Sequence, residues 1–199
     1  LPGSHDEGPC LLILGCEGRA GDVGRTRAAC TAICRRHGGL DLGSGVGAQW
    51  YAERFALPYL RDVLLDRGVM TDTLETATVW SNLASLHQRV TAALRQAGAP
   101  FVMCHVSHVY RTGASLYFTL LSRQEAGREI AQWQALKTAA TDAIMDGGGA
   151  LSHHHGIGYE HTAWMAQEHG ALGLDALRAM KAILDQDGMM NPGKVLPGS

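Results

Sequence analysis

The chain has 199 residues, 46% of them hydrophobic and 18% charged, and its 17 basic and 19 acidic residues leave a formal net charge of −2. This near balance offers no electrostatic attraction to nucleic acid, so we expect no nucleic-acid partner. No apolar run reaches the roughly 18 residues that a membrane-spanning helix requires. The five cysteines are odd in number and scattered, which favours a reducing compartment over a disulfide framework, and we expect a cytoplasmic location.

The first half of the chain alternates apolar runs with helical patterns. A short apolar run near the start is typical of a buried strand, and a Thr-rich stretch further on favours a second strand. Glycine and proline mark the ends of the helices. In chain order, the pattern predicts a strand over 10–16, helices over 22–37 and 59–66, a strand over 72–79 and a helix over 80–96.

The second half predicts a hairpin followed by two helices. Strand-like runs cover 101–110 and 115–121, with a turn between them at Arg111-Thr112-Gly113. A long helix over 125–145 and a last helix over 174–184 follow, and we expect one more strand between these two helices. The hairpin and the uneven units favour an α+β fold, a mostly antiparallel sheet with helices 80–97 and 125–146 packed on one face.

Three consecutive histidines, His153, His154 and His155, stand between Ser152 and Gly156. Imidazole can act as acid, base, hydrogen-bond donor or metal ligand near neutral pH, and glycine lets a backbone approach a ligand closely. The run therefore predicts one wall of a binding site, with a loop of solvated histidines as the alternative. Because neighbouring side chains of an extended segment point to opposite faces, we expect His154 to be oriented differently from the other two.

Four segments of the chain resemble a known family. The closing run Met189-Met190-Asn191-Pro192-Gly193-Lys194 is similar to the end of the FAD-linked oxidase C-terminal domain, the substrate cap of vanillyl-alcohol-oxidase-type flavoproteins. Three more runs narrow the resemblance to the alkyldihydroxyacetonephosphate synthase family. They are Pro58-Tyr59-Leu60-Arg61-Asp62, Gly113-Ala114-Ser115-Leu116-Tyr117-Phe118 and Ser152-His153-His154-His155-Gly156. The resemblance covers essentially the whole chain and implies a ferredoxin-like cap.

The resemblance implies an FAD-dependent enzyme of ether-lipid synthesis. Members of the family exchange the acyl chain of acyl-dihydroxyacetone phosphate for a fatty alcohol, through an adduct at the flavin N5. The implied partners are therefore a phosphorylated lipid precursor and a fatty alcohol, and the resemblance also allows peripheral membrane association and a homodimer. The family binds FAD mostly through an N-terminal domain that we do not find here, so we expect residues 1–199 to be the cap of a longer protein, inactive by itself.

Carried over residue by residue, the resemblance assigns catalysis to Tyr117 and to histidines 153–155. A phenol beside a ketone can donate or accept one proton. From the residues alone, Tyr117 also fits an aromatic side chain packed in the core of a sheet. Arg61 matches the family position that contacts substrate, and its guanidinium suits phosphate oxygens, although a surface charge paired with Asp62 or Asp66 is the alternative.

The remaining assignments concern the substrate anion, the flavin and a metal. Arg54 is a second candidate for anion contact, and the resemblance assigns flavin contacts to His154, His155 and Asn191. We expect no metal site, because the histidines lack carboxylate or thiolate partners at ligand spacing. Core, edge, surface or cap positions are expected for three other histidines, His105, His108 and His161.

Two other functions stay open. FAD-dependent 2-hydroxy-acid dehydrogenases carry a related cap, with a GDGNLH-like strand and a GEHG-like loop whose histidines can hold a divalent metal. In this chain Tyr117 stands where the first histidine would be and His154 where the glutamate would be, which removes two ligands. A non-catalytic binding module is the third alternative, if the natural protein is no longer than this chain.

Overall fold

The computed structural model describes residues 10–196. These residues form two compact units, and the boundary along the chain falls between Leu60 and Arg61. The first unit contains helices α1 (Ala20–Arg36) and α2 (Gly45–Glu53) and the short 3-10 helix η1 (Leu57–Tyr59). Helix α3 (Leu60–Asp66) leads into the second unit. Among residues 10–196, no helix combines the length and apolar character needed to cross a membrane.

The expected strand over 10–16 is wrong. These residues form no strand, and Leu11 and Leu12 are 64% and 65% exposed. A short apolar run predicts a strand only if another strand pairs with it, and the first unit contains no strand among its described residues. Helix α2 was not predicted, because its sequence begins with Gly-Val-Gly and lacks a helical apolar pattern.

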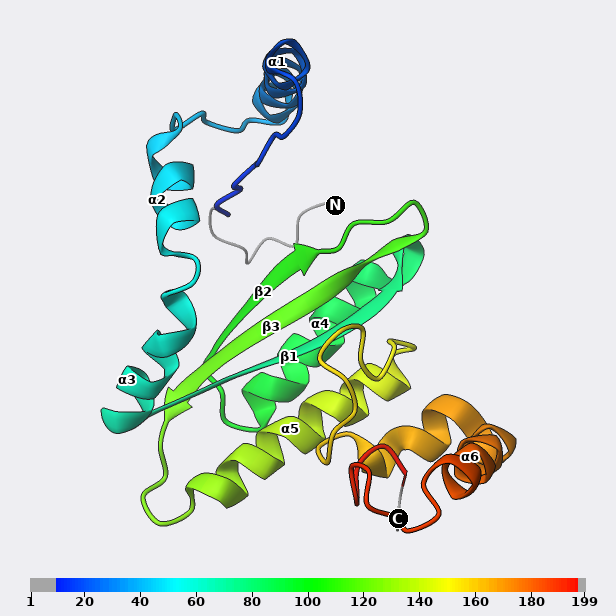
Figure 1. Ribbon diagram of the computed structural model, residues 1–199. Helices are drawn as coiled ribbons and strands as arrows, with labels where there is room; N and C mark the ends of the chain where they lie inside the picture. Colours follow the sequence, from blue (N-terminus) through cyan, green and yellow to red (C-terminus); the bar gives the residue numbers. More distant parts are fainter. Residues whose placement is uncertain (1–9, 197–199) are drawn as a thin grey trace. The chain divides into compact units, whose positions relative to one another are not determined.

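The second unit is built on a three-stranded antiparallel sheet (Figure 1). Its strands are β1 (Val69–Val79), β2 (Phe101–Ser107) and β3 (Gly113–Arg123), in the spatial order β1-β3-β2. Helices α4 (Trp80–Gln96) and α5 (Glu129–Asp146) pack on one face of this sheet. The predicted α+β class, the hairpin and both covering helices are therefore confirmed.

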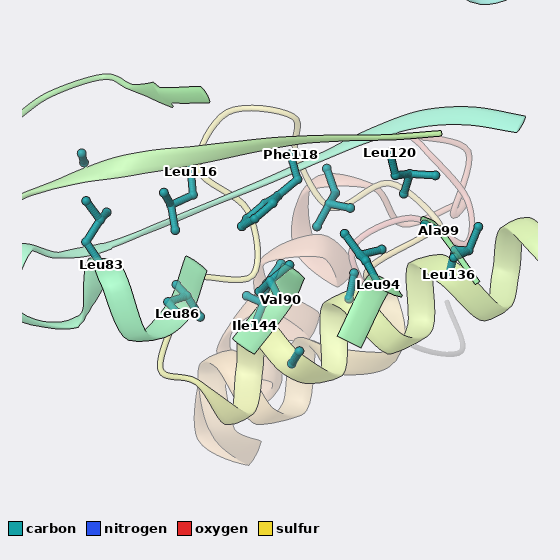
Figure 2. Close-up of a cluster of buried hydrophobic side chains, with 14 of the residues drawn as sticks. Leu83, Leu86, Val90, Leu94, Ala99, Leu116, Phe118, Leu120, Leu136 and Ile144 are labelled. Atoms are coloured by element: carbon teal, nitrogen blue, oxygen red, sulfur yellow. The ribbon is translucent and has the colours of Figure 1, made fainter. Parts of the chain in front are cut away.

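The hydrophobic core lies between this sheet face and the two helices (Figure 2). Alternate residues of β3, namely Leu116, Phe118 and Leu120, point toward the helices and are at most 1% exposed. The stripe that α4 presents to them was visible in the sequence as apolar residues three to four positions apart. It consists of Leu83, Leu86, Val90 and Leu94.

The region after α5 differs from the prediction. No strand follows α5 among the described residues; the 3-10 helix η2 (Thr162–Trp164) and helix α6 (Met165–Leu184) come next. Gly170, inside α6, has a φ of 68°, so the helix is kinked there. The first part of α6 was not predicted as a helix, because Gly170 and Gly173 lie within it and glycine disfavours a helix interior.

The segment after α5 crosses the edge of β1. Ala150 accepts a hydrogen bond from the Thr76 hydroxyl at 2.6 Å, and its own N–H donates to the Ala77 carbonyl at 2.9 Å. The crossing requires glycine at 149, because a Cβ there would lie 2.6 Å from the Thr76 hydroxyl oxygen. Beyond the edge, Leu151 enters a second, smaller hydrophobic cluster with Met165, Leu174 and Leu196. The beginning of the loop that carries the three histidines is thus anchored to β1 and to this cluster.

Candidate functional site

The candidate site lies on the sheet face opposite the helices. Tyr117 of β3 pairs with Glu75 of β1 on one side and with His105 of β2 on the other. Directly paired residues of antiparallel strands project their side chains to the same face. Because Leu116 and Phe118 face the helices, Tyr117, Glu75 and His105 form a row across the opposite face.

Glu75 holds the histidine loop. Its carboxylate is 1% exposed and accepts a hydrogen bond from the Ser152 hydroxyl at 2.7 Å. The backbone N–H groups of His153, His154 and His155 donate to the same carboxylate, each at 2.9 Å. The loop is therefore bound to the middle of a β-strand by one side chain.

These hydrogen bonds keep Glu75 ionised. Burial by itself would raise the pKa of this carboxyl group, because a charge is less stable away from water. The backbone N–H groups of His155, His154 and His153 and the Ser152 hydroxyl all stabilise the anion, and they lower the pKa from 4.5 to about 2. Glu75 is consequently a buried anion at any physiological pH.

The three histidines are held on a loop whose backbone is bound to the Glu75 carboxylate, and their rings point in two directions. The loop is bent rather than extended, so the expected alternation of His154 with its neighbours is wrong. The rings of both His154 and His155 approach Tyr117, with centroids 6.2 Å and 5.2 Å from the phenol ring. His153 turns instead toward Tyr110, whose hydroxyl lies 3.1 Å from its Nε2.

His108 joins the histidine loop from the hairpin. Strand β2 ends at Ser107, and the next residue has a left-handed φ of 45°, so His108 lies outside the strand in which the sequence placed it. The ring of His108 lies 5.0 Å from that of His153 and 4.9 Å from that of His154. One nitrogen of each ring lies within 4.8 Å of the other two, so these three residues could hold a metal ion.

His161 is the N-cap residue of η2, which agrees with the expected cap position, but its side chain is buried rather than on the surface. Its side chain lies beside a pocket of about 390 Å³ that Lys137 and His155 also line. The pKa of His161 is lowered by burial and by the charge of Lys137, so the ring is neutral near pH 7. Lys137 itself is paired with Asp72 at 3.2 Å and with Glu160 at 3.1 Å.

Neither of the two predicted arginines belongs to the strands that form this row. Arg61 is 61% exposed on α3 and pairs with Asp62 at 3.7 Å. Gln124, just beyond β3, hydrogen-bonds the end of α3, which places that helix near the Val69 end of β1, roughly 20 Å along the strand from Glu75. Arg54 belongs to the first unit, where its guanidinium stacks on the rings of its neighbours Tyr51 and Phe55.

The closing motif lies beside the histidine loop. Tyr159, four positions after His155, donates to the Pro192 carbonyl at 3.2 Å, and Val195 N–H donates to the Gly158 carbonyl at the same distance. Asn191 has a left-handed φ of 49°, a conformation that asparagine tolerates better than most residues. The structure therefore brings the neighbourhood of Asn191 to the segment that follows the histidines.

Comparison with known proteins agrees with this architecture. Residues 2–195 match the family model described as FAD linked oxidases, C-terminal domain. An alkyldihydroxyacetonephosphate synthase of Dictyostelium discoideum is 36% identical over 193 residues, which are 94% of this chain and 32% of the relative. The corresponding synthase of Trypanosoma brucei brucei is 32% identical over 94% of this chain and 31% of its own length.

A solved structure of an alkyldihydroxyacetonephosphate synthase superposes with a TM-score of 0.62 at 29% sequence identity, covering 87% of this chain and 29% of that chain. More distantly, the glycolate oxidase subunit GlcD of Escherichia coli strain K12 is 29% identical over 46% of this chain. The chain spans about a third of the length of the synthases that it matches.

Proposed function

Because this chain belongs to the FAD linked oxidase C-terminal domain family, we propose that it is the substrate-facing domain of an alkyldihydroxyacetonephosphate synthase. The proposed reaction replaces the acyl chain of acyl-dihydroxyacetone phosphate with a fatty alcohol. One observation carries the proposal: the Tyr117 phenol stands on a sheet face with His154 and His155 directly beside it. This arrangement supports the proposal, because an imidazole beside a phenol is a group that can exchange protons with it.

Tyr117 would hold or move a proton at its hydroxyl oxygen while one oxygen substituent of the substrate leaves and another enters. His154 and His155, as imidazoles, can donate to or accept from the phenol or the substrate near neutral pH. Arg61 would bind the substrate phosphate through its guanidinium. The carbon that carries the phosphate is bonded to the ketone carbon of the substrate, so this role requires Arg61 to lie close to Tyr117 when the substrate is bound.

The residues of this face also fit an FAD ring. The rings of Tyr117, His154 and His155 and the nearby Asn191 segment offer hydrogen-bond donors and acceptors, which suit the polar edge of an isoalloxazine. When bound, FAD would supply the reactive ring at which the substituents of the substrate ketone exchange. The residues of this chain would orient the substrate against it, exclude water and move protons.

The test is Tyr117→Phe in the full-length natural protein, because that variant loses only one oxygen. We expect FAD to stay bound and exchange of acyl for radiolabelled alcohol to fall by about 10²–10⁴-fold, the usual contribution of a general acid–base group. Tyr110→Phe is the matched control, since Tyr110 contacts His153 and is not assigned to the reaction. Undiminished exchange in Tyr117→Phe would contradict the proposed role.

A second candidate, an FAD-dependent 2-hydroxy-acid dehydrogenase, is favoured by one observation. The three imidazoles of His108, His153 and His154 lie close enough to bind a divalent metal, and GlcD is among the relatives. Oxidation of a 2-hydroxy acid that requires added metal and tolerates Tyr117→Phe would establish this candidate in place of the synthase. The higher identity and wider coverage of the synthases favour the first candidate.

A further inference from the structure

We propose that Glu75 is a positioning residue, a buried carboxylate that fixes the backbone of the histidine loop so that His154 and His155 face Tyr117. The inference rests on the proposed function for the identity of the reaction. Glu75 itself reaches no reacting group, because its oxygens are occupied by the loop that covers them. It acts through the histidines.

The donors of the loop converge on one oxygen of an ionised carboxylate, which has no donor of its own. The Ser152 hydroxyl and three consecutive backbone N–H groups, from residues 153, 154 and 155, all donate to Oε1. The His153 N–H also lies 2.9 Å from Oε2. A glutamine of the same shape would lose the negative charge that these donors stabilise, and an NH₂ group at the Oε2 position would face the His153 N–H, which cannot accept a hydrogen bond.

The position of Glu75 in the sheet explains why it can set geometry. It lies in the interior of β1 and is the direct antiparallel partner of Tyr117 on β3. The phenol and the histidine loop are therefore both attached to the same cross-strand row. A substitution at Glu75 is therefore expected to move the loop relative to the row that carries Tyr117.

No lysine or arginine neutralises this buried anion in the part of the chain that the structure describes. The nearest basic nitrogen that we find there belongs to His154, whose Nδ1 lies 3.6 Å from a Glu75 oxygen. A buried charge without a cation is costly unless hydrogen bonds compensate it. Retaining such a group is easier to understand if it holds a functional loop than if it serves packing alone.

The experiment compares Glu75→Gln with Glu168→Gln in the full-length natural protein loaded with FAD. Glu168 is the matched control, because its carboxylate accepts one backbone N–H, from Leu151 at 3.3 Å, where the same loop begins. In each variant we would measure FAD content, kcat for acyl-for-alcohol exchange, and amide hydrogen exchange at residues 153–155.

For Glu75→Gln we expect full FAD content, amide exchange at residues 153–155 that is roughly tenfold faster or more, and a kcat lower by about 10- to 100-fold. Glu168→Gln should keep amide exchange and kcat within about twofold of the wild type, because one oxygen still accepts its single N–H. Wild-type amide protection in Glu75→Gln, or lost protection with full kcat, would overturn the proposal.

If Glu75→Gln does not retain FAD, Glu75→Asp replaces it. Aspartate keeps the negative charge but is one methylene shorter, so we expect smaller losses of amide protection and kcat that occur together. A loss of one without the other would refute the positioning role. If the wild type does not perform the exchange reaction, the proposed function fails, whereas the amide measurement still decides whether Glu75 fixes the loop.

Discussion

The two faces of the sheet have opposite characters, although the same strands supply both. The face under α4 and α5 is apolar, and Leu116 and Phe118 on it are at most 1% exposed. The other face carries Glu75, Tyr117 and His105 in one row. Neighbouring residues of β3 thus belong either to the core or to the candidate site, and a strand can carry stability and chemistry without compromising either.

The difference between the two faces should have its largest effect on the free energy of unfolding. Phe118→Ala removes a fully buried ring that fills the space between sheet and helices, and we expect a loss of about 3–5 kcal/mol in the free energy of unfolding. Tyr117→Phe, one position away, should change it by less than about 1 kcal/mol. Urea denaturation followed by circular dichroism measures both, and similar losses for the two would show that the faces do not differ in this way.

Acid should weaken the site face selectively. Because the pKa of Glu75 is lowered to about 2 in the folded protein, its ionised form contributes stability that is complete above pH 4.5 and lost as the pH falls toward 2. A shift of this size corresponds to about 3 kcal/mol. Other groups also titrate in this range, so the measurement is the difference in urea stability between the wild type and Glu75→Gln.

That difference should be largest near pH 7 and shrink toward pH 2.5, because the wild-type carboxylate becomes protonated while glutamine does not titrate. A constant difference across this range would mean that Glu75 is not held as an anion by the loop. The helix-covered face should not contribute, since the residues that define its core there are apolar.

A smaller effect is expected where the chain passes from one face to the other. Thr76→Val keeps the shape of a fully buried side chain but removes its hydrogen bond to the Ala150 carbonyl, which should cost about 1–2 kcal/mol. Thr141→Val is the control, because the Thr141 hydroxyl bonds only within α5, to Lys137. Faster amide exchange at residues 153–155 in Thr76→Val, but not in Thr141→Val, would show that the hydrogen bond at the edge of β1 stabilises the histidine loop.

The sequence predicted the helix-covered face well because local periodicity determines it. The apolar spacing along residues 80–96 predicted α4 with the bounds that the structure gives it. Tyr117 and the three histidines could be selected by resemblance. Their clustering could not be derived from spacing, since it depends on a loop that crosses the edge of β1.

Glu75 was missed although a signal existed. The Thr-rich, strand-like run contains two acidic residues, Asp72 and Glu75, which is unusual because acidic residues are depleted in strands and rarely fully buried. The partner of Glu75, Ser152, is 77 positions away, and no local pattern connects the two. His108 was misplaced for a similar reason, since the end of β2 at Ser107 depends on pairing with Ser115 rather than on composition.

Substitution of Arg61 should have the smallest effect on stability, because this residue lies on α3 and not on either face of the sheet. Its side chain is 61% exposed, and its ion pair with Asp62 is between two exposed groups, which typically contributes 0–1 kcal/mol. Arg61→Lys should therefore leave the urea midpoint unchanged.

If Arg61 binds the substrate phosphate, the KM for acyl-dihydroxyacetone phosphate should rise roughly tenfold in Arg61→Lys, because an ammonium cannot reproduce the planar fork of a guanidinium. Asp62→Asn, which removes only the surface partner, should leave KM unchanged. An unaltered KM in Arg61→Lys would mean that Arg61 is only a surface arginine paired with Asp62. Another residue, close to Tyr117, would then have to bind the phosphate.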